Sequence, residues 1–160
     1  MSVRDQIGEA KTAFVFAGGG SFGAIQVGML HSLVAHGISA DMVVGSSVGA
    51  LNGAFYAGDP TLKGVEKLGD IWRALKRQDV FPMSWRTVLS FLWRRDFLIS
   101  LDGIRKLIDD HIPYRNLQDA RVPVHIVTTD IISGDSIVLS EGSTSDAIVA
   151  STSVRSTCTC

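Results

Sequence analysis

The sequence has little cysteine and almost no net charge. Of its 160 residues only Cys158 and Cys160 are cysteines, both within the last three positions. A Cys-Thr-Cys end provides neither a disulfide framework nor a metal site of the usual spacing, so we expect a reducing, cytoplasmic setting and no metal. The formal net charge of −1 gives no electrostatic reason to expect a nucleic-acid partner.

The sequence also lacks a long unbroken apolar run. Residues 12–30 and 42–58 carry no charge, but glycine turns interrupt both stretches. Neither stretch therefore fits a single membrane-crossing helix, and buried parallel strands with buried helices explain them better. Residues 1–11 show no secretory signal and are expected to be a polar lead-in. Residues 155–160 have no apolar pattern, and we expect a frayed tail there.

What the chain has is apolar content and two glycine-rich turns. Its hydrophobic fraction is 46%, enough for one folded domain over residues 1–160. The apolar pattern predicts strand, turn and helix twice in succession, at residues 12–17, 18–23 and 22–36, then 42–44, 45–47 and 48–56. This order is typical of an α/β fold with a parallel sheet.

The rest of the chain continues as an α/β pattern. Apolar spacing predicts a helix around Val65, Leu68, Trp72 and Leu75, and another from Ser100 to Ile112. Two strands are expected at residues 122–129 and 137–139, joined by a turn at Ser133-Gly134. One more helix is expected to begin near Asp146.

The second turn has the Gly-x-Ser-x-Gly spacing, formed by Gly45, Ser47 and Gly49. In a nucleophile elbow the serine lies in strained backbone between a strand and a helix. Both glycines are needed because a Cβ would collide with the neighbouring strand and helix. The hydroxyl then stands at a helix N-terminus, where N–H groups stabilise an oxyanion. The alternative from these residues alone is a glycine-rich turn without catalysis.

The two turns are expected to lie together, because carboxyl ends of adjacent parallel strands share one edge of the sheet. The second turn offers a nucleophile, and the first, residues 18–23, offers bare backbone N–H groups. Acyl transfer needs this pair: a hydroxyl that attacks the carbonyl, and donors about 3 Å from the developing oxyanion.

These residues resemble a known family. Residues 18–23 resemble the Gly-x-Gly-x-x-Gly oxyanion turn of the patatin-like phospholipases, and residues 45–54 resemble their nucleophile elbow. Thr128-Thr129-Asp130 with Gly134 resembles a later strand and turn of those domains. The resemblance runs from about Thr12 to about Ser153. It implies an α/β three-layer sandwich with a mainly parallel central sheet and a serine esterase that degrades lipids without a cofactor.

The resemblance also assigns the site. The family uses a Ser-Asp dyad, and by this resemblance Ser47 is the nucleophile. The substrate that the resemblance implies is a lipid or another carboxylic ester. The resemblance gives the N–H donors of the oxyanion hole as Gly18, Gly19, Gly20 and Val48. It gives the elbow glycines as Gly45 and Gly49, and the glycine that ends the first turn as Gly23.

The general base of the family is missing from this sequence. That base is an Asp in an Asp-Gly-Gly or Asp-Gly-Ala turn, and the only Asp-Gly pair here, Asp102-Gly103, comes well before the expected place. Residues 150–154 resemble the segment before the base, but Arg155 follows where the family continues with Pro-Gly. A serine without a base is a poor nucleophile. We therefore expect a truncated domain, incomplete at the C-terminus, that is inactive or very weak by itself.

Alternatives to the esterase remain. Gly18-x-Gly20-x-x-Gly23 after a strand is also the dinucleotide-binding fingerprint. That fold places an acidic residue at the end of the second strand, whereas here Asp41 lies before the second strand. A P-loop nucleotide site is favoured less than the dinucleotide site, because no Gly-Lys-Ser/Thr follows the turn. A non-catalytic fragment is a third alternative. A histidine could replace the missing base, but each of the four is explained more simply as a surface or core residue: His31, His36, His111 and His125.

Aromatic and basic residues lie side by side at residues 84–95. As a helix, this stretch could place tryptophan at the lipid headgroups and arginine at the phosphates, or else pack on the core with its arginines in solvent. The first alternative predicts peripheral membrane contact of a cytoplasmic protein through Trp85, Trp93, Arg94 and Arg95.

Overall fold

The computed structural model describes residues 11–74 and 101–153. The elements in chain order are β1 (Ala13–Phe16), η2 (Gly20–Phe22), α1 (Gly23–Ala35), β2 (Met42–Ser46), α2 (Val48–Gly58), α3 (Leu62–Ala74), α6 (Leu101–His111), η3 (Leu117–Asp119), β3 (Val124–Thr129), β4 (Ser136–Leu139) and α7 (Thr144–Thr152). The predictions for residues 1–10, 84–95 and 155–160 lie outside the described residues. Among the described helices, none has both the length and the apolar character needed to cross a bilayer.

The sheet has the order β1-β2-β3-β4. The first three strands are parallel, with Phe16 opposite Gly45 and Ser46 opposite Val127. β4 pairs antiparallel with β3 through the turn predicted at Ser133-Gly134. The α/β class and the mainly parallel central sheet expected from the sequence are confirmed.

One face of the sheet carries the core. Phe14 and Phe16 are buried on β1, and Val43 and Ile126 on the next strands are fully buried. This alternation is expected where one face meets helices. On the opposite face, Val15 is 73% exposed. The described helices pack on the Phe14 side, so the third layer of the predicted sandwich is not among the residues that the structure describes.

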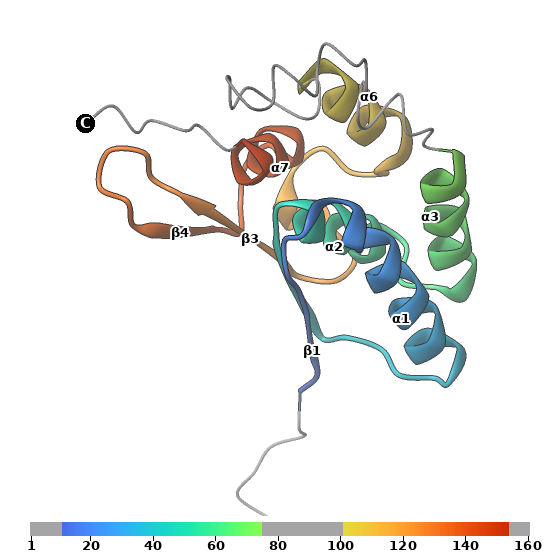
Figure 1. Ribbon diagram of the computed structural model, residues 1–160. Helices are drawn as coiled ribbons and strands as arrows, with labels where there is room; N and C mark the ends of the chain where they lie inside the picture. The colour runs from blue at the N-terminus through green and yellow to red at the C-terminus, as the bar shows by residue number, and fades with distance from the viewer. Residues whose placement is uncertain (1–10, 75–100, 154–160) are drawn as a thin grey trace, which may run out of the picture.

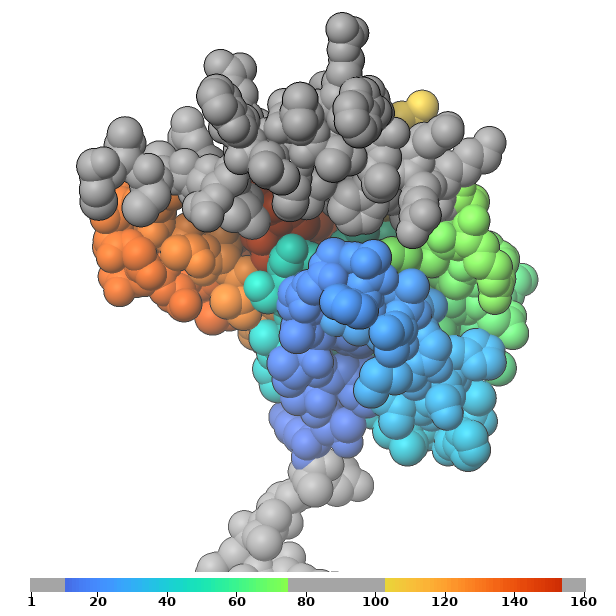
Figure 2. Space-filling model, in the orientation of Figure 1, coloured from blue at the N-terminus to red at the C-terminus, as the bar shows by residue number. Residues whose placement is uncertain are grey.

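α2 is the central helix of the covered face (Figure 1). It lies so close to the sheet that a Cβ on Gly53 would be 2.7 Å from Cγ1 of Val43. α1 and α3 pack together on one side of α2, and α7 lies against α2 and β3. In Figure 2, α7 (red) is visible between the β3–β4 hairpin (orange) and α1 (blue). The end of β2 and the start of α2 are therefore enclosed by elements from both halves of the chain.

Candidate active site

Ser47 occupies the junction between β2 and α2. Its backbone has φ 54° and ψ −125°, and it is the one non-glycine residue of positive φ in the described parts of the chain. Its carbonyl accepts a hydrogen bond from the amide of Ala50 at 2.9 Å, so α2 begins directly at this serine. The side chain is half-buried. Ser47 thus has the strained, partly accessible position that an elbow nucleophile needs.

The two elbow glycines permit this junction sterically. A Cβ on Gly45 would lie 2.5 Å from the carbonyl oxygen of Gly49. A Cβ on Gly49 would lie 2.2 Å from the carbonyl oxygen of Phe16. Real Cβ atoms do not approach backbone oxygen this closely, so α2 can contact β1 and β2 here only because both positions lack side chains.

The first glycine turn meets Ser47 directly. A Cβ on Gly18 would be 3.3 Å from Cβ of Ser47 and 4.0 Å from its Oγ. Gly19 and Gly20 have φ values of 153° and 57°, which favour glycine. All three glycines are exposed. The two turns that the sequence places at one edge of the sheet are brought together in the structure.

Gly23 and Val48 close the packing behind this site. A Cβ on Gly23 would lie 2.6 Å from both Cγ2 of Val48 and the Trp72 ring, so the start of α1 approaches the start of α2 without a side chain between them. Val48 is the first residue of α2. The N-terminal end of that helix carries positive partial charge, which favours an anion beside Ser47.

Ser151 is a site residue that the sequence did not identify. Its Oγ accepts a hydrogen bond from the Ser47 amide at 2.8 Å and donates one to the Val127 carbonyl at 2.6 Å. Ser151 lies near the end of α7, so this helix holds the backbone of the elbow serine against β3. The spacing of the sequence gives no signal for this contact, because the two serines are 104 positions apart.

In residues 11–74 and 101–153, the amide of Ser47 bonds Ser151, and no hydrogen bond joins the Ser47 hydroxyl to a histidine or a carboxylate. The Nδ1 of His36 instead lies 2.7 Å from the carbonyl of Ser32, within its own helix region. His125 lies on β3 opposite Val44, and His111 is exposed at the end of α6.

Asp130 follows β3 and stabilises the hairpin turn. Its Oδ1 accepts hydrogen bonds from the amides of Ser133 and Ile132, at 3.0 and 2.7 Å. These two bonds, the one from Ser133 first, lower the pKa of the Asp130 carboxyl below its ordinary value. The strand and turn that resemble a later family element therefore form a hydrogen-bonded turn in which the carboxylate has a structural role.

The structure gives no support to the dinucleotide alternative. Asp41 accepts a hydrogen bond from the amide of Thr12 at 2.7 Å, at the amino ends of β1 and β2. A ribose-binding acid belongs at the opposite edge of the sheet, at the carboxyl ends of the strands.

In the described residues, no three side chains of His, Cys, Asp or Glu lie together as metal ligands.

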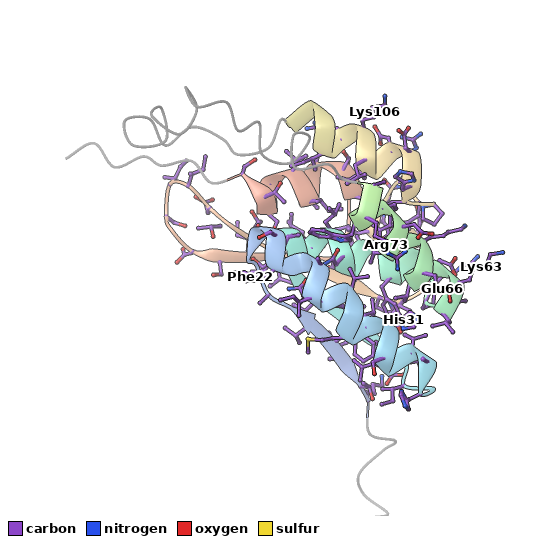
Figure 3. The ribbon with its side chains drawn as sticks, turned by 45° about the vertical axis from the view of Figure 1, so that its right-hand side comes forward. Phe22, His31, Lys63, Glu66, Arg73 and Lys106 are labelled. Atoms are coloured by element: carbon purple, nitrogen blue, oxygen red, sulfur yellow. The ribbon has the colours of Figure 1, made fainter. Side chains whose placement is uncertain are left out.

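A groove of about 680 Å³ lies between α1 and α3, and Ser47 is not among the residues that line it. Its floor includes Val27, Val65 and Trp72, and His31, Glu66 and Arg73 lie around it (Figure 3). This groove is therefore separate from the site formed by the two glycine turns.

Comparisons with known proteins match most of this chain to one protein family. The family model for patatin-like phospholipases matches residues 14–158. The chain is 29% identical over 130 residues to patatin-like phospholipase domain-containing protein 7 of Rattus norvegicus, covering 81% of this chain and 9% of that protein. It is 30% identical over 129 residues to neuropathy target esterase sws of Drosophila sechellia, covering 81% of this chain and 8% of that protein. The chain thus spans about a tenth of the length of these relatives.

Proposed function

Because this chain belongs to the patatin-like phospholipase family, we propose that Ser47 is the nucleophile of a serine hydrolase that cleaves carboxylic esters of lipids. Oγ of Ser47, with its proton released to solvent, attacks the ester carbonyl carbon, and the electron pair of the C=O bond moves onto oxygen to form an oxyanion. Collapse of this oxyanion breaks the bond to the alcohol, which leaves with a proton from water, and water then hydrolyses the acyl-serine. The donors proposed for it are the amides of Gly18, Gly19, Gly20 and Val48. Donors of this kind contribute about 3 kcal/mol each where they have been measured.

One observation carries this proposal: the first glycine turn lies against the strained serine. Gly18 is close enough that its absent Cβ would be 3.3 Å from Cβ of Ser47. The amide of Ser47 is bound to Ser151, so it is not free to stabilise an oxyanion. The free donors must come from the start of α2 and from the glycine turn, which are the two elements that meet here.

We propose further that residues 1–160 alone provide the nucleophile and the donors without an efficient base. The sequence contains no Asp-Gly-Gly or Asp-Gly-Ala turn. A serine hydroxyl without a base attacks only through its small ionised fraction, and that fraction rises roughly tenfold per pH unit. The 160-residue chain is therefore expected to react slowly near neutral pH and faster in alkali.

Labelling with a fluorophosphonate probe tests the nucleophile and the base separately. The probe is incubated with the chain from about pH 7 to about pH 9, a range well below the pKa of a serine hydroxyl, and the modified peptide is identified by mass spectrometry. We expect modification at Ser47 only, a rate that rises steadily with pH, and complete loss in Ser47→Ala. Ser46→Ala is the matched control, since Ser46 is a half-buried serine one position earlier.

The two halves of the proposal fail in different ways. Modification of another residue, or none at any pH, contradicts Ser47 as the nucleophile. Rapid stoichiometric labelling that reaches a plateau below about pH 8 contradicts the absence of a base, because a plateau reports a titrating group in the protein.

The lipid surface is proposed to be contacted through Trp85, Trp93, Arg94 and Arg95. The support is that tryptophans stand directly beside arginines in the sequence, a composition that suits an interfacial helix. Vesicles that contain anionic phospholipid are expected to bind the chain, and the double variant Trp93→Ala with Arg94→Ala to lose that binding. Equal binding by the parent and the double variant contradicts this assignment.

A further inference from the structure

We infer that Asn52 and Gln26 are positioning residues that hold both ends of the Gly18–Gly23 turn in place beside Ser47. The inference rests on the proposed function of Ser47. Neither side chain carries a nucleophile or a base, and neither was singled out by the sequence. Their role follows from a hydrogen-bonded series that begins on α3, crosses α2 and ends at the residue before the glycine turn.

Asn52 is the centre of this series. It is completely buried, one turn into the helix that starts at Ser47. Its Oδ1 accepts a hydrogen bond from Nε1 of Trp72 at 2.9 Å. Its Nδ2 donates to the carbonyl of Gly23 and to Oε1 of Gln26, each at 3.0 Å. The Asn52 oxygen and both of its N–H donors are therefore engaged, as expected of a buried amide.

The orientation of both amide groups is fixed by their partners. An indole N–H only donates, so the Asn52 atom facing Trp72 must be the oxygen. A carbonyl only accepts, so the Gln26 atom facing Ala17 must be the nitrogen, and its donation to the Ala17 carbonyl spans 2.6 Å. The series therefore has one direction, from the Trp72 N–H through Asn52 and Gln26 to the Ala17 carbonyl.

The Ala17 carbonyl connects this series to the proposed donors. Ala17 and Gly18 share one planar trans peptide group, in which the C=O and the N–H point in opposite directions. A hydrogen bond that holds the Ala17 carbonyl therefore also sets the direction of the Gly18 N–H. Gly18 is the residue whose Cβ position lies nearest Ser47 among the turn glycines.

Asn52 also holds the other end of the turn, at Gly23. Asn52 binds the Gly23 carbonyl directly and Ala17 through Gln26, so both ends of the turn are tied to the helix that begins at the nucleophile. Glycine residues between them have no side chains that could hold the backbone, and their conformational freedom is large. The amide direction in such a turn depends on the fixed points at its two ends.

Gln26 gives the test, because it is only partly buried and its replacement is expected to leave the fold intact. Gln26→Glu keeps an acceptor for Asn52 but removes the donor to the Ala17 carbonyl. Ser32→Ala, at an exposed position on the same helix, is the control. With the fluorophosphonate, we expect Gln26→Glu to lower the maximal rate of Ser47 modification roughly ten- to hundredfold, a loss typical of a small misplacement, while the concentration for half-maximal rate changes little.

A second measurement decides the inference without any reaction at Ser47. In ¹H–¹⁵N spectra of glycine-labelled protein, the amide signals of Gly18, Gly19 and Gly20 are expected to shift or broaden in Gln26→Glu and to stay unchanged in Ser32→Ala. Unchanged glycine signals in a folded Gln26→Glu protein overturn the inference, whatever the probe does. If the parent is modified at Ser47 and Gln26→Glu reacts at the same rate, the positioning role is wrong and the proposed nucleophile stands. If no modification occurs in the parent, the proposed function fails, and the glycine signals still decide the positioning role.

Discussion

The amide of Ser47 donates a hydrogen bond to Oγ of Ser151 at 2.8 Å, and Ser151 in turn binds the carbonyl of Val127. This single hydroxyl joins the elbow serine, the helix α7 and the strand β3. It holds a backbone conformation that L-residues rarely adopt, and it removes the Ser47 N–H from the set of oxyanion donors. The site therefore depends on α7 although the proposed nucleophile and donors lie on earlier elements.

Removal of the Ser151 hydroxyl leaves the Ser47 amide unpaired in a half-buried place. Ser151→Ala is expected to lower the free energy of unfolding by about 1–2 kcal/mol and to slow modification of Ser47 by the phosphonate probe. Urea unfolding and probe kinetics measure the two effects.

Ser153→Ala is the matched control for that variant. The Ser153 hydroxyl bonds the carbonyl of Val149 within the same helix region, at 2.7 Å. Its loss is expected to change the free energy of unfolding by less than about 0.5 kcal/mol. Equal effects of the two substitutions would mean that Ser151 has no special role at the elbow.

Backbone strain at Ser47 predicts an order of stabilities. Glycine adopts φ 54° and ψ −125° readily, whereas alanine has the same Cβ as serine. Ser47→Gly is therefore expected to unfold at higher urea than Ser47→Ala, with a free-energy difference of about 1–2 kcal/mol. If Ser47→Ala is as stable as Ser47→Gly, the elbow stores no strain.

Two glycine-to-alanine substitutions in helices are expected to act in opposite directions. At Gly49 the new Cβ would lie 2.2 Å from the Phe16 carbonyl oxygen, so Gly49→Ala is expected to prevent folding or to destabilise the chain severely. At Gly28 on α1, no atom outside the adjacent backbone of the same helix lies within 4 Å of the new Cβ. Gly28→Ala is expected to stabilise the chain by about 0.5–1 kcal/mol, because alanine is the better helix former. Thermal unfolding of both variants measures the contrast, and an equal loss at Gly28 would contradict it.

Acidification is expected to weaken the β3–β4 turn through Asp130. Hydrogen bonds from the amides of Ser133 and Ile132 hold the pKa of this carboxyl below its ordinary value. A group with a lowered folded-state pKa stabilises the fold above the unfolded value of about 3.9 and loses that contribution as the pH falls through the folded-state pKa. Carbon-detected NMR titration should therefore place Asp130 below about 3.9. As a control, the amide signals of Ile132 and Ser133 should no longer follow this titration in Asp130→Asn. A titration midpoint of Asp130 at or above the ordinary value would contradict the account.

Local patterns predict most of the described elements. The helix around Val65, Leu68 and Trp72 appears as α3, and the hairpin expected at Ser133-Gly134 joins β3 and β4. The boundaries differ by a few residues: the strand expected from residue 122 begins at Val124, and the helix expected near Asp146 begins at Thr144 after its cap, Ser143. Periodicity and turn chemistry are local properties, which explains why they predict element type better than element ends.

The candidate site is predictable only in part. Glycine spacing marks Gly18 and Ser47 because each turn carries its own chemical pattern. No sequence motif marks Asn52, Gln26 or Ser151, since their roles depend on which backbone groups the folded chain brings beside them. A polar residue in an apolar helix, such as Asn52 in α2, is the one local sign that a buried partner exists.

The most direct test of the central claim is a crystal structure of the Ser47–phosphonate adduct, whose phosphoryl oxygen stands in for the oxyanion of ester cleavage. The account predicts phosphorus bonded to Oγ of Ser47 and the phosphoryl oxygen within about 3 Å of at least two amide nitrogens from Gly18, Gly19, Gly20 and Val48. A phosphoryl oxygen that faces solvent, away from all four amides, would contradict it.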